Sequence, residues 1–173
     1  MAQAASWPAM KTALIIGNSG GIGSAMQQAL TARGVQVQGL SRSGDGLDVT
    51  DEASVQRVLS GVTGPFDLIL VATGALEIDG AAPEKTLRAL EPTAMVDQFA
   101  LNAMGPALVL KQALPLLPRN APAVFAVLSA RVGSIGDNRL GGWYSYRTAK
   151  AALNQLIHSA AIELARTHKH LAC

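Results

Sequence analysis

The sequence predicts a doubly wound α/β fold, in which a parallel sheet carries helices on both faces. Short apolar runs alternate along the chain with stretches of helical periodicity, which favours parallel strands joined by right-handed crossovers. The runs are apolar throughout, as strands buried on both faces are. Candidate functional motifs come directly after these runs, at the sheet edge where such folds bind their ligands.

Four apolar runs are expected to form strands, and residues 48–50 a further short one. The four runs lie at residues 12–16, 35–40, 67–71 and 123–129. Residues 44–46 are expected to form a turn, and 74–83 and 131–142 to form loops, because glycine and proline punctuate these segments.

Amphipathic stretches between the runs are expected to form helices. They lie at residues 22–33, from 51 to about 60, at 93–117 and from 144 to about 170. Gly34 follows the first of them, where a helix C-terminal glycine belongs. Pro106 is expected to kink the third, because proline lacks the N–H that a helix interior needs.

Composition and length indicate a single globular domain. The chain has 173 residues, of which 49% are hydrophobic and 15% charged, so it is too apolar to be disordered. We expect a loose leader at residues 1–10 and one domain at residues 11–173, within the usual size of about 100–200 residues. The net charge of +2 gives no strong attraction to nucleic acid.

Cysteine and histidine content gives no sign of a metal site. Cys173 is the single cysteine, and His168 and its neighbours are expected at a solvated helix end. No apolar run is long enough to span a membrane, and no secretion signal precedes the first strand. A cytoplasmic protein is therefore expected.

A glycine-rich turn, Gly17–Gly23, follows the first strand and precedes the first helix. It offers backbone without Cβ atoms and free N–H groups at a helix N-terminus, which is what phosphate binding needs. The spacing is G-x-x-x-G-x-G, which fits neither a P-loop nor G-x-G-x-x-G. The alternative is an ordinary tight strand-to-helix turn.

Tyr146 and Lys150 are the strongest catalytic candidates. Residues four apart share a helix face, so the phenol and the ammonium can meet in one site. A nearby ammonium is expected to lower the pKa of the phenol from its ordinary value near ~10. Such a Tyr could exchange a proton with a carbonyl or alcohol oxygen. Tyr144 lies on another face and is expected to pack with Trp143.

Together with the glycine spacing, the stretch Gly141–Asn154 resembles the short-chain dehydrogenase/reductase family, in its C-factor and sniffer-like carbonyl reductase branch. The resemblance covers nearly the whole chain and implies a Rossmann-like fold. It implies that Tyr146 is the general acid/base and that Lys150 also holds the nicotinamide ribose. It places the Asn of the family's proton relay at Asn102, for which the alternative is an Asn that bonds neighbouring backbone at a kink.

The resemblance also implies a dinucleotide cofactor and its contacts. These fall on Gly17, Asn18, Ser19, Gly21, Ile22, Gly23, Ser41, Arg42, Asp48, Val49, Ala72, Thr73, Gly74, Tyr146 and Lys150. The second strand ends without a carboxylate, and Arg42 can pair with a 2′-phosphate, so NADP is expected rather than NAD. Asp48 matches the position that meets the adenine amino group, although it could equally cap the next helix.

Two departures from the family pattern stand out. Where the branch has a substrate-binding serine after the fourth long strand, this chain has Ala130, so Ser129 and Ser134 are the candidate substitutes. The chain also ends near the close of the long helix, so the usual last strands and the substrate lobe are expected to be absent.

The leading hypothesis is an NADP(H)-dependent oxidoreductase acting on a small carbonyl or alcohol. The alternative, motivated by Ala130, is a dinucleotide-binding or regulatory module without turnover. A methyltransferase-like fold is weaker, because Ser41 and Arg42 offer no acidic residue after the second strand. The long helices, with small residues such as Ala151 and Ala160, favour a homodimer or homotetramer.

Overall fold

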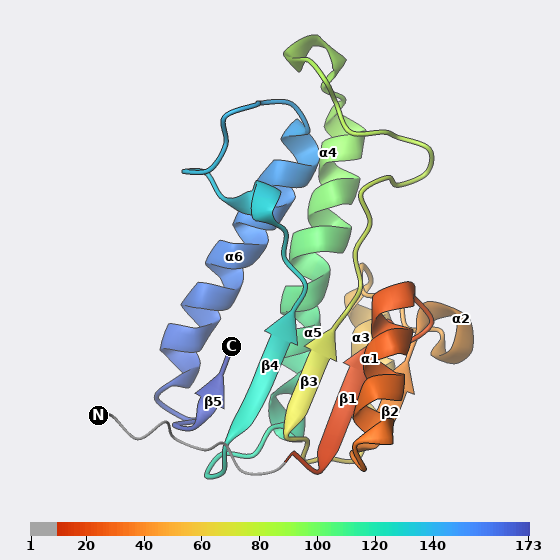
Figure 1. Cartoon of the computed structure of the whole chain (residues 1–173), viewed down its shortest axis with the longest axis vertical. Coiled ribbons are helices and arrows are strands. Elements are labelled where there is room, and N and C mark those ends of the chain that lie inside the picture. Colours follow the sequence, from red (N-terminus) through yellow and green to blue (C-terminus); the bar gives the residue numbers. More distant parts are fainter. Residues whose placement is uncertain (1–9) are drawn as a thin grey trace.

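The computed structural model describes residues 10–173, in which all five strands form one sheet (Figure 1). Most of the predicted leader, residues 1–10, lies outside the described residues. Met10, its last residue, packs against the sheet core next to Val37 and Leu68. That part of the expected leader therefore contributes to the domain.

The sheet has five parallel strands in the order β2-β1-β3-β4-β5, and the predicted doubly wound fold is confirmed. The strands are β1 (Thr12–Ile16), β2 (Gln36–Leu40), β3 (Leu68–Val71), β4 (Ala123–Val127) and β5 (Leu171–Ala172). Strand β2 lies on one side of β1 and β3 on the other, so the strand order reverses between them. Ligands of such sheets bind at the carboxyl ends of the strands at this reversal.

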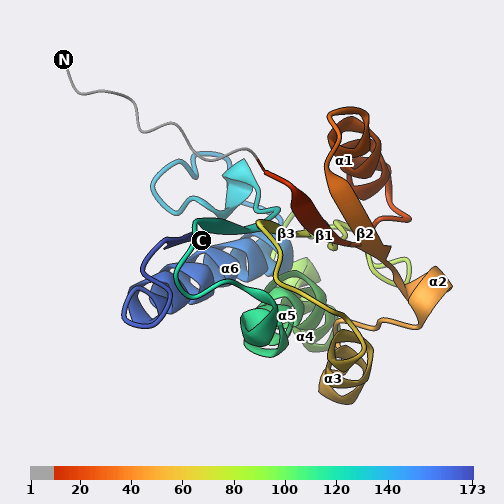
Figure 2. The same cartoon turned by 90° about the horizontal axis from the view of Figure 1, so that it is seen from below.

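Helices cover both faces of the sheet, with α1 on one face and α3, α5 and α6 on the other (Figure 2). The α-helices are α1 (Gly21–Ala32), α2 (Arg42–Asp45), α3 (Glu52–Ser60), α4 (Pro92–Phe99), α5 (Gly105–Ala113) and α6 (Tyr144–Leu164). Within residues 10–173 none of the helices is both long and apolar enough to cross a bilayer.

Strand β1 shows how the two faces are packed. Leu14 and Ile16 point into the larger core beneath α3, α5 and α6, whereas Ala13 and Ile15 point into the core beneath α1. All four are fully buried, which explains why the strand is apolar from Ala13 to Ile16.

The strand expected at residues 48–50 does not form. Asp48 Oδ1 accepts hydrogen bonds from the backbone N–H of Thr50 at 2.9 Å and from its hydroxyl at 2.7 Å, which closes a turn instead. Residues 44 and 45 of the turn expected at 44–46 belong instead to the short helix α2, and Gly46 caps its end in the left-handed region (φ 66°).

The helix expected at 93–117 is divided by a π-helical turn at Ala100–Met104. The N–H of Gly105 bonds to the carbonyl of Ala100, five residues back, and Pro106 has no N–H with which to continue an ordinary ladder. The irregularity therefore precedes Pro106. It surrounds Asn102, which is fully buried.

The last helix is shorter than expected. Helix α6 ends at Leu164, and the chain then turns to form β5 beside β4. His168 is buried in this turn, 5% exposed, with its Nδ1 3.0 Å from the Thr167 hydroxyl, so the prediction of a solvated helix end was wrong. Strand β5 also adds a fifth strand that the sequence patterns did not predict.

Candidate functional site

A cleft of about 320 Å³ opens at the carboxyl ends of β1, β2 and β3. It is lined by residues of the glycine turn, of the segment after β2 and of the segment after β3. Of the predicted cofactor contacts, Gly17, Ser19, Ser41, Arg42, Asp48, Val49, Ala72, Thr73 and Gly74 line it. The predicted contacts Asn18, Gly21, Ile22 and Gly23 belong to the same turn and helix start without lining this cleft.

The glycine turn is tightly packed at two of its glycines. Gly17 lies in the left-handed region (φ 90°), and a Cβ there would come within 3.1 Å of the Ala72 carbonyl carbon and the Thr73 methyl group. A Cβ at Gly23 would overlap the Gly17 carbonyl oxygen, whereas nothing lies within 4 Å of a Cβ at Gly21. Gly23 therefore lets helix α1 pack on the turn, and Gly21 leaves the helix N-terminus open.

Unpartnered polar atoms at this edge fit a polar ligand. Thr73 Oγ1 and Asn18 Oδ1 are buried without a hydrogen-bond partner within residues 10–173. Buried polar groups normally have partners, and Thr73 lines the cleft. Together with the open N-terminus of α1, these atoms match the hydroxyl and phosphate groups of a dinucleotide.

The segment after β2 presents a cation to the cleft. The Ser41 hydroxyl accepts from the Gly44 N–H at 3.0 Å, and the Ser41 N–H donates to Asp45 Oδ2 at 2.8 Å. The Asp45 carboxylate thus accepts from the backbone of Ser41. Arg42 is exposed and forms no ion pair among residues 10–173. The bonds from Thr50, and more weakly the Arg42 charge, lower the pKa of Asp48 despite its partial burial.

Tyr146 and Lys150 meet at the next strand end, as their spacing predicts. Lys150 is 3% exposed, and its Nζ donates to the Leu128 carbonyl just beyond β4 at 2.8 Å. The same Nζ lies 5.8 Å from the centre of the Tyr146 ring. It is also 3.4 Å from where a Cβ on Gly74 would lie, so the ammonium borders the cleft wall.

The pKa values of this pair differ from the expectation. Burial raises the pKa of Tyr146 above its ordinary value and lowers that of Lys150, because a charged group is disfavoured away from water. The predicted lowering of the phenol pKa is therefore absent in the structure. At neutral pH the phenol therefore carries its proton.

Asn102 holds the chain that follows β3. Its Oδ1 accepts from the Ala75 N–H at 3.2 Å, and its Nδ2 donates to the Ala75 carbonyl at 2.9 Å and to Gln98 Oε1 at 2.7 Å. Gln98 Nε2 in turn donates to the Leu76 carbonyl at 2.8 Å. The alternative of an Asn that bonds the backbone of its own kink is not observed, because both backbone partners belong to Ala75, on another segment.

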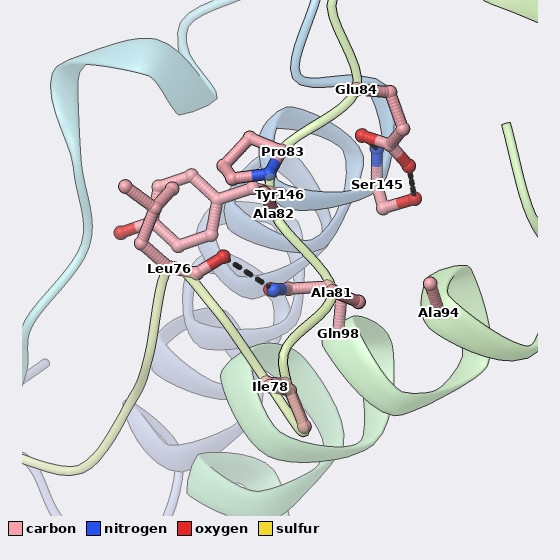
Figure 3. Close-up of a pocket in the computed structure, with 10 residues that line it drawn as sticks. All are labelled: Leu76, Ile78, Ala81, Ala82, Pro83, Glu84, Ala94, Gln98, Ser145 and Tyr146. Carbon is pink, nitrogen blue, oxygen red and sulfur yellow. Dashed lines mark hydrogen bonds between the residues drawn. The ribbon is translucent and has the colours of Figure 1, made fainter. Parts of the chain in front are cut away.

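Two buried polar residues of this region were missed in the sequence. Gln98 and Glu84 are 5% and 7% exposed, and no local motif marks them. Glu84 accepts hydrogen bonds from the backbone N–H and the hydroxyl of Ser145 at the start of α6 (Figure 3). Only an indirect signal for Glu84 was available in the sequence. Trp143, the residue before α6, cannot cap a helix with its side chain, so the helix start needs an acceptor from elsewhere in the chain.

Trp143 packs edge-on against Tyr146, with ring centres 6.4 Å apart. The expected pairing of Trp143 with Tyr144 is therefore replaced by a contact with the candidate catalytic residue.

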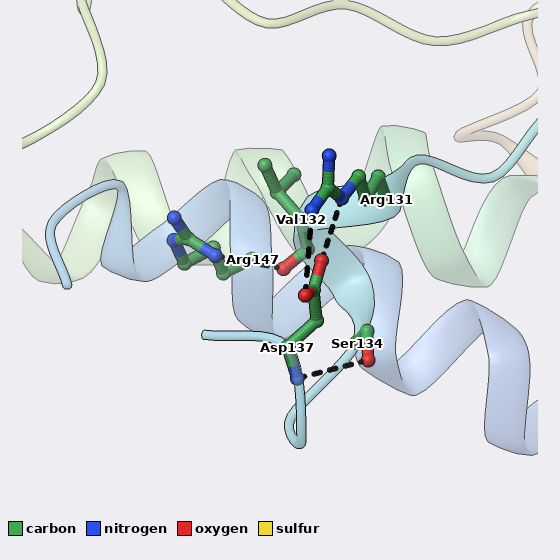
Figure 4. A network of polar contacts seen from close by, with 5 residues as sticks. All are labelled: Arg131, Val132, Ser134, Asp137 and Arg147. Atoms are coloured by element: carbon green, nitrogen blue, oxygen red, sulfur yellow. Dashed lines mark hydrogen bonds and ion pairs between the residues drawn. The ribbon is translucent and has the colours of Figure 1, made fainter. Parts of the chain in front are cut away.

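The two candidate substitute serines are both engaged elsewhere. The Ser129 hydroxyl donates to Asn154 Oδ1 at 2.6 Å. The Ser134 hydroxyl accepts from the Asp137 N–H at 3.3 Å, in a loop where Arg131 pairs with Asp137 at 2.6 Å (Figure 4). No hydrogen bond joins either hydroxyl to Tyr146 within the described chain.

Arg147, on helix α6, contacts this loop, and its guanidinium donates to the carbonyls of Gly142 and Val132 at 3.1 and 3.3 Å. Elsewhere among residues 10–173, no group of three or more His, Cys, Asp or Glu side chains is arranged to hold a metal ion.

Comparison with known proteins identifies the family. The model of the short chain dehydrogenase family matches residues 11–169, which is most of the chain. The chain belongs to the short-chain dehydrogenase family. This membership confirms the predicted class of enzyme, that of NAD(P)-dependent oxidoreductases.

Individual relatives agree with this short-chain dehydrogenase assignment. The chain is 31% identical over 162 residues to 1-hydroxy-2-glutathionyl-2-methyl-3-butene dehydrogenase of a Rhodococcus species, covering 85% of this chain and 68% of that protein. It is 34% identical over 102 residues to C-signal of Myxococcus xanthus, covering 59% of this chain and 58% of that protein. The chain is thus similar, over part of its length, to a protein of the predicted branch.

A solved structure extends the comparison to three dimensions. A putative short-chain dehydrogenase/reductase from Burkholderia multivorans with bound NADP is 26% identical, with a TM-score of 0.78 over 95% of this chain and 77% of that one. The short-chain dehydrogenase fold of this chain is thus shared almost throughout its length.

Proposed function

We propose that this protein transfers hydride between NADP(H) and a small carbonyl or alcohol, with Tyr146 as general acid/base. The observation that carries the proposal is the Lys150 ammonium, which is anchored at the end of β4 by the Leu128 carbonyl and faces the Tyr146 ring. The adjoining cleft supports it with the residues of a dinucleotide site.

The residues divide the work between binding and proton transfer. NADPH, when bound, supplies the hydride. The open N-terminus of α1 and the Arg42 guanidinium would hold its phosphates. The Tyr146 phenol, protonated at neutral pH, would give its proton to a carbonyl oxygen, and the buried Lys150 ammonium would stabilise the phenolate left behind. Asn102 keeps the wall after β3 in place.

The test of cofactor choice is Arg42→Ala. We expect its dissociation constant for NADPH to rise about tenfold or more, because one charge-assisted phosphate contact is lost, and that for NADH to stay within about twofold. Titration of the dinucleotide fluorescence measures both. Equal weakening for the two dinucleotides would contradict a 2′-phosphate contact and, with it, the preference for NADP.

A second candidate function is dinucleotide binding without turnover, and Ala130 favours it. The Ser129 hydroxyl already donates to Asn154, and the Ser134 hydroxyl lies in the Asp137 loop, where it accepts from the Asp137 N–H and has no bond to Tyr146 among residues 10–173. Such a protein would bind NADPH and oxidise none of it with any aldehyde or ketone of a broad panel. Measurable turnover by the unmodified protein would exclude this candidate.

Ala130→Ser is expected to increase turnover about tenfold. Losing one such donor elsewhere costs about a hundredfold, and a gain is smaller because the surroundings are not adapted to the new hydroxyl. NADPH consumption compares the variant with the parent and with Ser134→Ala, which should change little. A variant no faster than the parent would show that position 130 does not face the substrate.

We also propose that the protein is a homodimer or homotetramer. An apolar groove between α4 and α6 contains Val96, 65% exposed, and Phe99, 42% exposed, and a second copy of the chain could cover these side chains. Light scattering at micromolar concentration should give a mass of two or four chains, and Val96→Glu should reduce it. A mass of one chain for the parent would contradict the proposal.

A further inference from the structure

The start of helix α6 is strained and has no cap of its own. Gly141, Gly142 and Trp143 follow one another in the left-handed region, with φ of 65°, 66° and 54°. Trp143, which precedes the helix, makes no side-chain cap bond, although the first N–H groups of every helix need partners. A non-glycine residue in this conformation persists only where its surroundings hold it.

Glu84 supplies what the helix lacks. Its carboxylate accepts from the N–H of Ser145 at 3.2 Å and from the Ser145 hydroxyl. Its backbone carbonyl accepts from the Trp143 N–H at 2.5 Å. A Cβ at Gly142 would come within 3.3 Å of that carbonyl, so the two segments touch backbone to backbone.

The carboxylate is suited to this position by its charge. Burial alone would raise the pKa of Glu84, but the hydrogen bonds from Ser145 and from the Glu84 backbone together outweigh it, and the pKa is lowered. The N-terminal end of the 21-residue helix α6 also favours a negative charge. Within residues 10–173 the Glu84 carboxylate forms no ion pair with a Lys or Arg. Its side-chain hydrogen bonds go to Ser145 at the start of α6.

A substrate has no room to reach this carboxylate. The space enclosed by Glu84, Pro83, Leu76 and the Tyr146 ring is about 10 Å³, no more than about one water molecule needs (Figure 3). The same segment is tied down again at Leu76 by Gln98. The chain from Leu76 to Glu84 is therefore a fixed wall beside Tyr146.

We propose that Glu84 is a positioning residue for Tyr146. It caps α6 from a segment about sixty residues earlier, holds the strained Trp143 through its backbone carbonyl, and so sets the direction of the phenol one residue after Ser145. The expected effect on kcat rests on the proposed function of Tyr146 as general acid/base. The effect of Glu84 on the position of the Tyr146 ring does not depend on that function.

Fluorine NMR measures the positioning without any turnover. The chain has two tyrosines, so 3-fluorotyrosine labelling gives two resonances, which Tyr144→Phe assigns. In Glu84→Ala we expect the Tyr146 resonance to shift or split. In Glu84→Gln, whose amide oxygen still accepts from Ser145, the change should be smaller. Glu77→Gln, an exposed acid of the same segment, is the matched control and should leave it unchanged.

Kinetics give the second readout. Glu84→Ala should lower kcat about tenfold, as misplacement of a proton donor does, and keep the NADPH dissociation constant within about twofold. A folded Glu84→Ala with the parental Tyr146 resonance and kcat would overturn the inference. If that variant does not fold, Glu84→Gln decides by the same two measurements, and a resonance identical to the parent's would overturn it.

The two proposals can fail separately. A parent protein that neither binds NADPH nor reduces any carbonyl would contradict the proposed function. The Tyr146 resonance would still decide whether Glu84 positions the phenol.

Discussion

Tyr146→Phe is expected to lower carbonyl reduction about a thousandfold and to leave NADPH binding nearly unchanged. The substitution removes the proton donor and keeps the ring that packs against Trp143. General acid catalysis by a positioned side chain contributes about 10²–10⁴ in rate, and the phenol is the protonated group beside the Lys150 ammonium. Initial rates of NADPH oxidation with an aldehyde substrate measure the effect.

Tyr144→Phe is the matched control, because it removes a phenol two residues away on another face of the same helix. It should retain the parental rate within about twofold. Burial raises the pKa of Tyr146, so the parent's reduction rate should be level through neutral pH and fall only in the alkaline range, where the proton is lost. Equal rates for Tyr146→Phe and the parent would refute the assigned acid.

Gly23→Ala is expected to weaken NADPH binding about a hundredfold and to destabilise the fold. Its Cβ would overlap the Gly17 carbonyl oxygen, so α1 and the glycine turn must move apart. Overpacking of this kind costs about 1–3 kcal/mol, and about 3 kcal/mol lost from the bound state corresponds to roughly a hundredfold in affinity. Thermal unfolding and fluorescence titration measure the two effects.

Gly21→Ala separates packing from ligand approach. Nothing in the protein lies within 4 Å of its Cβ, so stability should be unchanged, whereas NADPH affinity should fall about tenfold where phosphate approaches the helix N-terminus. Gly136→Ala, equally open but on the exposed loop after β4, should change neither. A Gly23→Ala protein with parental stability and affinity would contradict the packing described here.

The fold could be predicted because its signals are local. Strand β1 is apolar from Ala13 to Ile16 since both of its faces are covered there. Helix α1 ends at Ala32, and Gly34 shortly after it takes the left-handed conformation (φ 81°) that glycine adopts readily. A strand was wrongly expected at residues 48–50, because this prediction also used local signals alone. In the structure Asp48 closes a turn by accepting hydrogen bonds from Thr50.

The Tyr146–Lys150 pair could be predicted because both residues lie on one helix, and residues four apart on a helix face the same side. The pKa of Tyr146 could not, because it depends on burial by segments far away in the chain. Asn102 was recognised as a buried polar residue, but its partner Ala75 lies 27 residues earlier and no pattern connects the two.

By itself the sequence determined the first four strands of the sheet, the glycine turn and the pairing of Tyr146 with Lys150, since helix and strand periodicities act over a few residues. The tertiary structure alone decided that Gln98 and Glu84 hold the wall beside the phenol, that Asp45 serves backbone, and that His168 is buried. Hydrogen bonds between distant segments exist only after the sheet has assembled, so no local pattern contains them.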